Sequence, residues 1–291
     1  MHGDDIVLAR SVGTRLGTGL GEDGRLDVMA RERTLATIRD YVAVVRRHAA
    51  SIDALATSAL RRATDAAAFV DEVEALTGVP PRIISGDEEA TYSFLGATRG
   101  VGTRGRVGVL DVGGGSTELA VGTPARIERT LSLEIGAVRL AERHPLLLGA
   151  RGLTPLERSA LVERARADAG AVLAPLAELA GFEELLAVGG TVFTAAAMIA
   201  RNPLRDGVPI DARARTTLID ALLARDLDAR RAMAHIRPQR ADILPAGLIV
   251  VDEAARVLRI DRLRVSHADL LAGYLRSGAY RERALPERPR I

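Results

Sequence analysis

The sequence contains no cysteine, no tryptophan and no lysine in its 291 residues. Without cysteine, the chain cannot form disulfides, thiol nucleophiles or cysteine-ligated metal and iron–sulfur centres. Without lysine, a Walker-type phosphate loop and Schiff-base chemistry are also excluded, because both need the lysine amine. All 40 basic residues are therefore arginine, whose guanidinium binds phosphate oxygens in pairs. Genomic base composition is the alternative explanation for this arginine usage.

Aromatic residues and long apolar runs are also scarce. Aromatics make up 3% of the chain and the formal net charge is +2, so we expect no nucleic-acid surface. No apolar run approaches the roughly 18 residues needed to cross a bilayer. The opening MHGDDIVLAR is acidic where a signal peptide would be basic. We therefore expect a cytoplasmic protein without a membrane segment, and the five histidines show no metal-ligand spacing.

Predicted strands and helices alternate along the chain, which is typical of an α/β architecture in two lobes. Hydrophobic periodicity predicts strands at 4–10, 53–60, 80–85, 107–114, 116–122, 126–135, 184–190 and 262–266. It predicts helices at 27–50, 64–78, 86–100 and 154–180, another from residue 191, and a frayed tail at 280–291. A glycine- and arginine-rich stretch at 97–106 indicates a boundary, so we expect domains at 1–104 and 105–291.

The stretch VGVLDVGGGSTELAVG, residues 107–122, carries the clearest chemical signal. A dinucleotide fingerprint would space its glycines and open a helix, whereas these glycines are contiguous and lead into a strand pattern. Glycines 113–115 would let backbone amides approach a phosphate closely, and Ser116 and Thr117 would add hydroxyl donors. Asp111 and Glu118 flank the turn and suit Mg²⁺, which prefers oxygen ligands. A purely structural hairpin is the alternative.

Two weaker signals lie on either side of this hairpin. In AVGGTVFTAAAM, 187–198, a strand meets a Gly-Gly turn and a helix, which places helix amides near a ligand or merely allows close packing. In ISGDEEA, 84–90, three carboxylates follow a strand. They are explained either as first-turn helix charges or as the source of a general base.

Taken together, these stretches resemble the exopolyphosphatase/guanosine pentaphosphate phosphohydrolase family, of the acetate and sugar kinase, heat-shock ATPase and actin superfamily. The resemblance is carried by stretches in family order across nearly the whole chain, namely RLGTGL (15–20), ATSALRRAT (56–64), IISGDEEA (83–90), VLDVGGGSTELAVG (109–122), SLEIGAVRL (132–140), AVGGT (187–191), RADILPAG (240–247) and LRVSHADLLAGYL (263–275). ISGDEEA followed by DVGGGSTE is the specific pair.

The resemblance implies two actin-like, ribonuclease H-like lobes around a central cleft that holds phosphates and Mg²⁺. It implies release of the terminal phosphate of inorganic polyphosphate, or conversion of guanosine pentaphosphate to the tetraphosphate. By motif position Glu89 corresponds to the general base, and Asp111 and Glu118 to the metal-site carboxylates. The phosphate-binding positions would be Arg61, Gly113, Gly114, Gly115, Ser116, Thr117, Gly189, Gly190 and Thr191.

One departure from the family concerns the beginning of the chain. The family opens with a strand and a first phosphate loop of the type D-x-G-S-N-S, and neither occurs here. We therefore expect a first lobe that is incomplete at its N-terminus, with an exposed sheet edge. A misassigned start or truncation, a shortened homologue that binds without hydrolysing, and completion of the sheet by another segment are the competing explanations.

Two further functions stay open beside the hydrolase. One is a sensor module that holds polyphosphate or guanosine tetra- or pentaphosphate without cleaving it. The other is a small-molecule kinase of the same superfamily. Family members often pair as dimers, so a homodimer is a possible assembly, although nothing in the composition requires one.

Overall fold

The computed structural model describes residues 8–20, 23–48, 51–149, 152–201 and 206–279. Most of the strand expected at 4–10 lies outside these residues, and 8–10 are not in a strand. The tail expected to fray, 280–291, lies outside them too. No helix in the described ranges combines the length and the apolar character that a membrane span requires.

The first lobe consists of helices around a very small sheet. Its elements are α1 (Val28–Val45), β1 (Leu55–Ala56), α2 (Ser58–Arg62), α3 (Ala66–Thr77) and β2 (Arg82–Ile83). Strands β1 and β2 are parallel and pair with each other, so the strands expected at 53–60 and 80–85 are real but much shorter than predicted. Helix α2 occupies the second half of the range expected for the first of them. The lobe's core is built from Leu20, Leu26, Leu60, Phe69 and Val73.

The second lobe is organised around a six-stranded mixed sheet of order β5-β4-β3-β6-β8-β7. Its strands are β3 (Val107–Val112), β4 (Thr117–Thr123), β5 (Arg126–Leu133), β6 (Glu184–Val188), β7 (Pro209–Asp211) and β8 (Arg262–Val265). The hairpin predicted at 107–122 is confirmed, because β3 and β4 pair antiparallel. The three-residue strand β7 was not predicted, since its single buried residue leaves no periodicity to detect.

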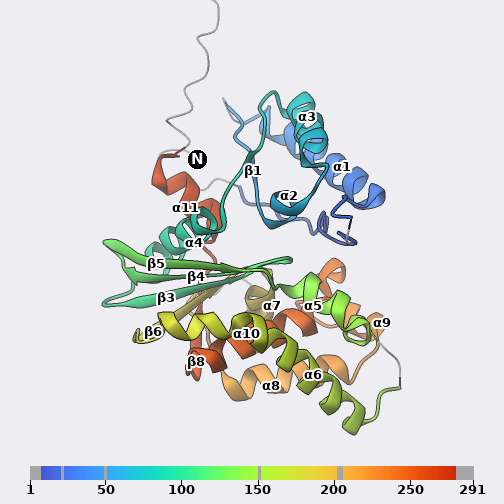
Figure 1. Cartoon of the computed structure of the whole chain (residues 1–291), viewed down its shortest axis with the longest axis vertical. Coiled ribbons are helices and arrows are strands. Elements are labelled where there is room, and N and C mark those ends of the chain that lie inside the picture. The colour runs from blue at the N-terminus through green and yellow to red at the C-terminus, as the bar shows by residue number, and fades with distance from the viewer. Residues whose placement is uncertain (1–7, 21–22, 49–50, 150–151, 202–205, 280–291) are drawn as a thin grey trace, which may run out of the picture.

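Helices cover both faces of this sheet (Figure 1). Helices α4 (Gly86–Val101) and α11 (Leu270–Ser277) lie on one face, between the sheet and the first lobe. The other face carries α5 (Ala137–Arg143), α6 (Pro155–Leu173), α7 (Gly190–Ala200), α8 (Ala212–Leu223) and α10 (Leu244–Val257), with α9 (Leu227–Arg231) beyond them. Buried residues of both faces form one large and one smaller apolar core. The two-lobed α/β architecture expected from the sequence is therefore confirmed.

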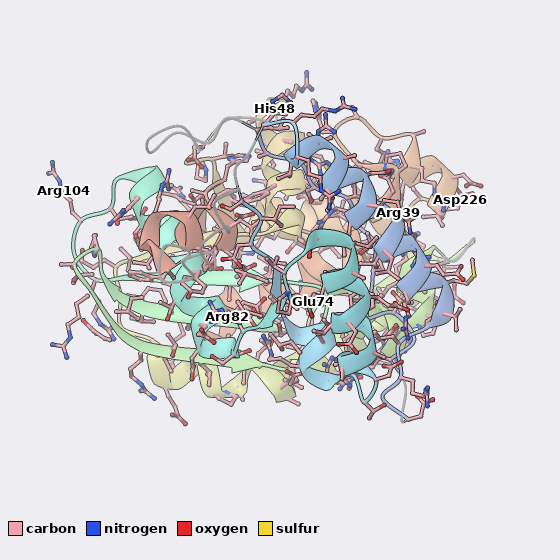
Figure 2. The ribbon with its side chains drawn as sticks, turned by 90° about the horizontal axis from the view of Figure 1, so that it is seen from above. Arg39, His48, Glu74, Arg82, Arg104 and Asp226 are labelled. Carbon is pink, nitrogen blue, oxygen red and sulfur yellow. The ribbon has the colours of Figure 1, made fainter. Side chains whose placement is uncertain are left out.

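Helix α4 connects the lobes and is packed on the second of them. Ala90, Phe94 and Ala97 are buried against Val107 and Val109 of the sheet. The boundary expected at 104/105 thus follows a helix that already belongs by contact to the large sheet, and the boundary itself stays a prediction. Seen from above, Arg104 lies at one end of the molecule, and Asp226 lies at the other (Figure 2).

Candidate active site

Two carboxylates face each other across the β3–β4 hairpin. Asp111 and Glu118 are register partners in this antiparallel pair. The twofold alternation of a strand places them on the same face as Val109 and Ala120, which is the face covered by α4. Like charges at directly opposed positions are destabilising. The hairpin therefore carries an electrostatic cost that calls for a proton or a cation.

A third carboxylate, Glu89, reaches this pair from the first turn of α4. The turn is held by a capping box in which the side chains of Ser85 and Glu88 satisfy each other's backbone amides. Glu89 is 8% exposed and accepts a hydrogen bond of 2.7 Å from Nη1 of Arg61. The same Nη1 donates to the carbonyl of Ile84 at 3.0 Å. Glu89 is thus buried, with one arginine as its direct partner.

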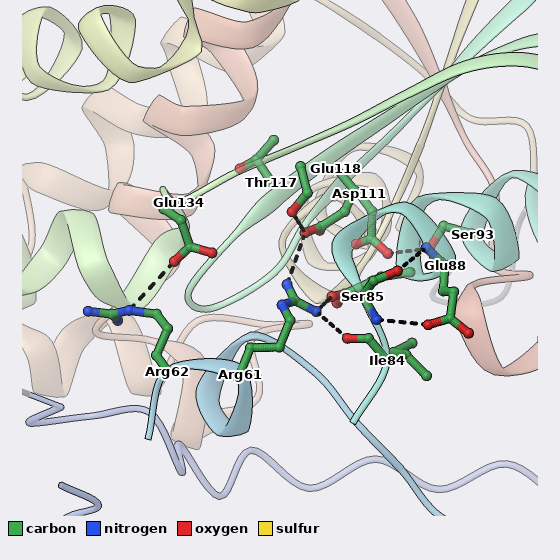
Figure 3. Close-up of polar contacts among 12 residues, drawn as sticks. Arg61, Arg62, Ile84, Ser85, Glu88, Ser93, Asp111, Thr117, Glu118 and Glu134 are labelled. Carbon is green, nitrogen blue, oxygen red and sulfur yellow. Dashed lines mark hydrogen bonds and ion pairs between the residues drawn. The ribbon is translucent and has the colours of Figure 1, made fainter. Parts of the chain in front are cut away.

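Arg61 links the first lobe to two of these carboxylates, Glu89 and Glu118. It projects from α2 of the first lobe, and its Nη2 lies 3.8 Å from Oε1 of Glu118. Figure 3 shows this guanidinium between the first-lobe helix and the acidic groups of the hairpin. One guanidinium therefore serves two carboxylates, and the site holds more negative than positive charge.

The pKa values of all three carboxyl groups are raised. Burial raises the pKa of Asp111 to about 7, although a 2.6 Å hydrogen bond from Ser93 opposes the shift. Burial, Glu89 and Asp111 together raise the pKa of Glu118 well above its ordinary value. Burial also raises the pKa of Glu89, against the lowering effect of Arg61. Each group is easier to protonate than in water because burial disfavours its charged form and the neighbouring positive charge does not offset this fully.

The turn between the strands presents its amides rather than its carbonyls. The carbonyls of Gly113 and Gly114 accept hydrogen bonds from the first amides of α5, at Ala137 and Val138. This arrangement requires glycine at 136, where a Cβ would lie 2.6 Å from the backbone of Gly114. The amides of residues 114–116 donate to no other group within the described ranges. They are free to bind an anion.

The second Gly-Gly turn lies beside the first. Gly189 adopts a left-handed conformation with φ +97°, and a Cβ there would lie 3.0 Å from Oδ1 of Asp111. Helix α7 begins at Gly190 without a side-chain cap, so its first amides are open to a ligand. Thr191 is 5% exposed. A Cβ at Gly190 would collide with the guanidinium of Arg240, which lies directly over this turn.

These groups surround a cavity of about 350 Å³ between the lobes. Nine of the twelve predicted catalytic, metal and phosphate-binding residues line this cavity. The predicted residues that line it are Glu89, Asp111, Gly113, Gly114, Gly115, Ser116, Gly189, Gly190 and Thr191. Arg61, Thr117 and Glu118 are not among the residues that line the cavity. The hydroxyl of Thr117 donates to the carbonyl of Ile135 at 2.6 Å, so it supports the hairpin as the structure stands.

Sequence reasoning assigned no role to several polar side chains that also line the cavity, among them Ser58, Arg62, Arg139 and Arg240. All four occur in stretches quoted above for their resemblance to a family. Their positions relative to the cavity depend on how α2, α5 and the segment before α10 pack together. No local sequence pattern predicts that packing. In an arginine-rich chain, an arginine that lines a cleft has no signal of its own.

The acidic cluster fits a divalent cation shared with a substrate. Oε2 of Glu118 is buried and has no hydrogen-bond partner among the described residues, and Asp111 faces Glu118 directly across the hairpin. No three histidine or acidic side chains in the described part of the chain form a ready-made metal cage. Mg²⁺ does not need one, because it commonly uses one or two carboxylates together with water and substrate phosphates.

Comparison with known proteins gives a consistent picture. The model of the Ppx/GppA phosphatase family matches residues 2–281. Exopolyphosphatase 2 of Mycobacterium tuberculosis is 34% identical over 284 residues, which cover 89% of this chain and 85% of that protein.

Solved structures agree with the sequence matches. The crystal structure of an exopolyphosphatase-like protein has a TM-score of 0.81 and 28% identity, covering 92% of this chain and 90% of the other. The Aquifex aeolicus member of the Ppx/GppA family has a TM-score of 0.71 and 25% identity, covering 94% and 88%. The chain therefore belongs to the Ppx/GppA phosphatase family and is a phosphatase.

Proposed function

We propose that this phosphatase releases the terminal phosphate of inorganic polyphosphate by attack of a water molecule that Glu89 activates. The single observation that carries the proposal is the position of Glu89. Its carboxylate lines the cavity and is held by Arg61, and two turns with available amides line the same cavity. The exopolyphosphatases among the relatives and neighbours support polyphosphate as the substrate.

The proposed reaction follows from what the residues of the site can do. Glu89 accepts a proton from the attacking water, and the water oxygen forms a new bond to the terminal phosphorus. The bridging P–O bond breaks, and the shortened polyphosphate leaves with the bridging oxygen. Arg61 stabilises the ionised form of Glu89 and orients it. The amides of residues 114–116 and of the first turn of α7 bind the oxygens on which negative charge develops.

Mg²⁺ is part of this proposal. Asp111 and Glu118 are the residues that would hold it. When bound, Mg²⁺ would offset the charge of phosphate oxygens and of these two carboxylates.

Guanosine pentaphosphate is the second candidate substrate, because its terminal phosphate is joined by the same phosphoanhydride bond. The observation that favours it is the volume of the cavity, about 350 Å³, which lies within the range of small-molecule sites. Comparing phosphate release from the two compounds by the same preparation would rank them.

The test is phosphate release from polyphosphate with Mg²⁺ present. We expect Glu89→Gln to lower kcat by roughly 10³-fold, in the middle of the range that loss of a general base costs. Asp87→Asn is the matched control, since Asp87 is two residues away and bonds to Thr130 at 2.7 Å. It should keep near-normal turnover.

Two results would contradict the proposal. Normal turnover by the Glu89→Gln variant would remove Glu89 as the base. Thermal stabilisation by polyphosphate with no phosphate release by the wild-type chain would favour the sensor function instead.

A further inference from the structure

Two arginines at the cavity share one carboxylate. Arg62 lies on α2, Arg139 lies on α5, and both line the cavity. Glu134, in the connection from β5 to α5, forms an ion pair with Arg139. Its Oε2 also lies 3.6 Å from Nε of Arg62, the contact marked between these residues in Figure 3. The three side chains link the first lobe to the second.

This cluster has a surplus of positive charge. Burial lowers the pKa of Arg139, and repulsion by Arg62 and Arg143 lowers it further, against the effect of Glu134. Nε of Arg139 is buried and donates to no described group. Glu134 itself is about half exposed, with a side-chain exposure of 48%. A single, partly hydrated carboxylate thus opposes several guanidinium groups, and the cluster can accept an anion.

Ser58 joins the cluster to the turn of the hairpin. It precedes Arg62 by one helical turn on α2, and both side chains line the cavity. Ser58 is 6% exposed, and its Oγ has no hydrogen-bond partner among the described residues. A Cβ placed on Gly115 would lie 2.7 Å from this oxygen. An unsatisfied hydroxyl so close to the amides of the turn indicates a ligand that bonds to both.

We propose that Ser58, Arg62 and Arg139 form a second phosphate subsite, for the phosphate that follows the one being cleaved. The assignment of the cleaved phosphate to the hairpin turn rests on the proposed function. In the absence of substrate, Glu134 occupies the two guanidinium groups, and a polyphosphate replaces it. Two linked phosphates would engage the turn and the arginines together, so the site selects phosphate chains over a single phosphate.

The proposal predicts opposite effects of removing the two kinds of charge. Dissociation constants for tripolyphosphate and for orthophosphate are measured with Mg²⁺ from ligand-dependent thermal stability, in proteins that all carry Glu89→Gln so that tripolyphosphate is not hydrolysed. Arg62→Gln and Arg139→Gln should each weaken tripolyphosphate binding roughly tenfold or more, as expected for a lost bond between charged groups. Glu134→Gln should tighten it, because the competing carboxylate is gone. The dissociation constant for orthophosphate should change less than about twofold in all three variants, which is smaller than the effect of losing one hydrogen bond.

Two further variants separate this effect from general damage. Arg126→Gln removes the same charge at the opposite end of β5 and is exposed, so it should bind tripolyphosphate like the protein with Glu89→Gln alone. Arg139→Lys should recover part of the lost affinity, because it restores charge without the planar guanidinium. Misfolding would instead weaken the binding of both ligands in every variant, whether the substitution removes a positive or a negative charge.

The subsite is overturned if the protein with Glu89→Gln alone binds tripolyphosphate no more tightly than orthophosphate. It is also overturned if Glu134→Gln weakens binding as the arginine variants do, or if Arg126→Gln weakens it equally. These measurements need no turnover, so they remain decisive even if the chain releases no phosphate. Conversely, phosphate release with unaltered binding in the arginine variants would retain the proposed function and reject the subsite.

Discussion

Asp252 and Asp111 are both carboxylates enclosed by the fold, but their surroundings differ. Asp252 on α10 accepts hydrogen bonds from Arg166 at 2.6 Å and from Arg215 at 2.8 Å. Arg215 in turn donates to the carbonyls of Ile210 and Asp261. Among the described residues, the carboxylate of Asp111 accepts one hydrogen bond, from Ser93, and it faces Glu118 across the hairpin.

The difference distinguishes a carboxylate that the protein's own arginines neutralise from one that, under the proposed function, a ligand would neutralise. The cluster around Asp252 contains its own counter-ions and lies among helices away from the cavity. The cluster around Asp111 lines the cavity and contains an excess of carboxylates, which a folded chain tolerates only at a cost. Within one molecule, this imbalance supports the proposal that substrate and cation bind at the second cluster.

The largest expected effect tests the balanced cluster. Asp252→Asn would leave the side chain of Arg215, which is 1% exposed, without its carboxylate. Breaking such a buried pair should cost about 3–5 kcal/mol of unfolding free energy, measured by urea denaturation. Activity per folded molecule should stay unchanged. A loss below about 1 kcal/mol, the size expected of an exposed ion pair, would show that the two clusters do not differ as described.

The next largest effect tests the cluster around Asp111, where one substitution should lower activity and raise stability. Asp111→Asn should lower kcat by roughly 10²–10³-fold, comparable to removing one preorganised electrostatic group from an active site. The same change removes a buried charge, so the melting temperature of the metal-free protein at pH 8 should rise by roughly 2–4 °C. Calorimetry and phosphate release measure the two parts. A fall in both quantities would make Asp111 a structural residue like Asp252.

The smallest effect sharpens the comparison through pH. The folded-state pKa of Asp111 is raised to about 7, so its contribution to stability is fully present below the ordinary carboxyl pKa. It is lost as pH rises through about 7. The metal-free protein should therefore melt at a lower temperature at pH 8 than at pH 5, and Mg²⁺ should restore more stability at pH 8.

The control for this pH experiment is the Asp111→Asn variant, in which the dependence on both pH and Mg²⁺ should shrink. Equal stabilisation by Mg²⁺ at pH 5 and pH 8 in the wild type would contradict the assignment of this carboxylate to the cation.

Much of the fold was predictable because local pattern and tertiary position agree. The hairpin at 107–122 combines alternation with a glycine turn, and the first turn of α4 has its capping box and three acidic residues. The strands β1, β2 and β7 have two or three residues each, too few for any period to define their ends. Their pairing partners decide their length.

The candidate site was predictable only in part, for the same reason. Asp111, Glu89 and the two glycine turns stand next to strong local signals, and the structure brings them to one cavity. The hydroxyl of Thr117 donates instead to the carbonyl of Ile135, in the connection from β5 to α5. Arg62 on α2 and Arg139 on α5 were missed because their proximity joins segments more than 70 positions apart.

The sequence by itself determined the order of strands and helices, the glycine turns and the identity of the acidic groups, because propensity, alternation and backbone freedom are properties of neighbouring residues. Only the tertiary structure decided which carboxylates lack counter-ions and which arginines reach the cavity. Charge balance depends on distances between distant segments, and it is the packing of α2, α4 and α5 around the hairpin that sets those distances.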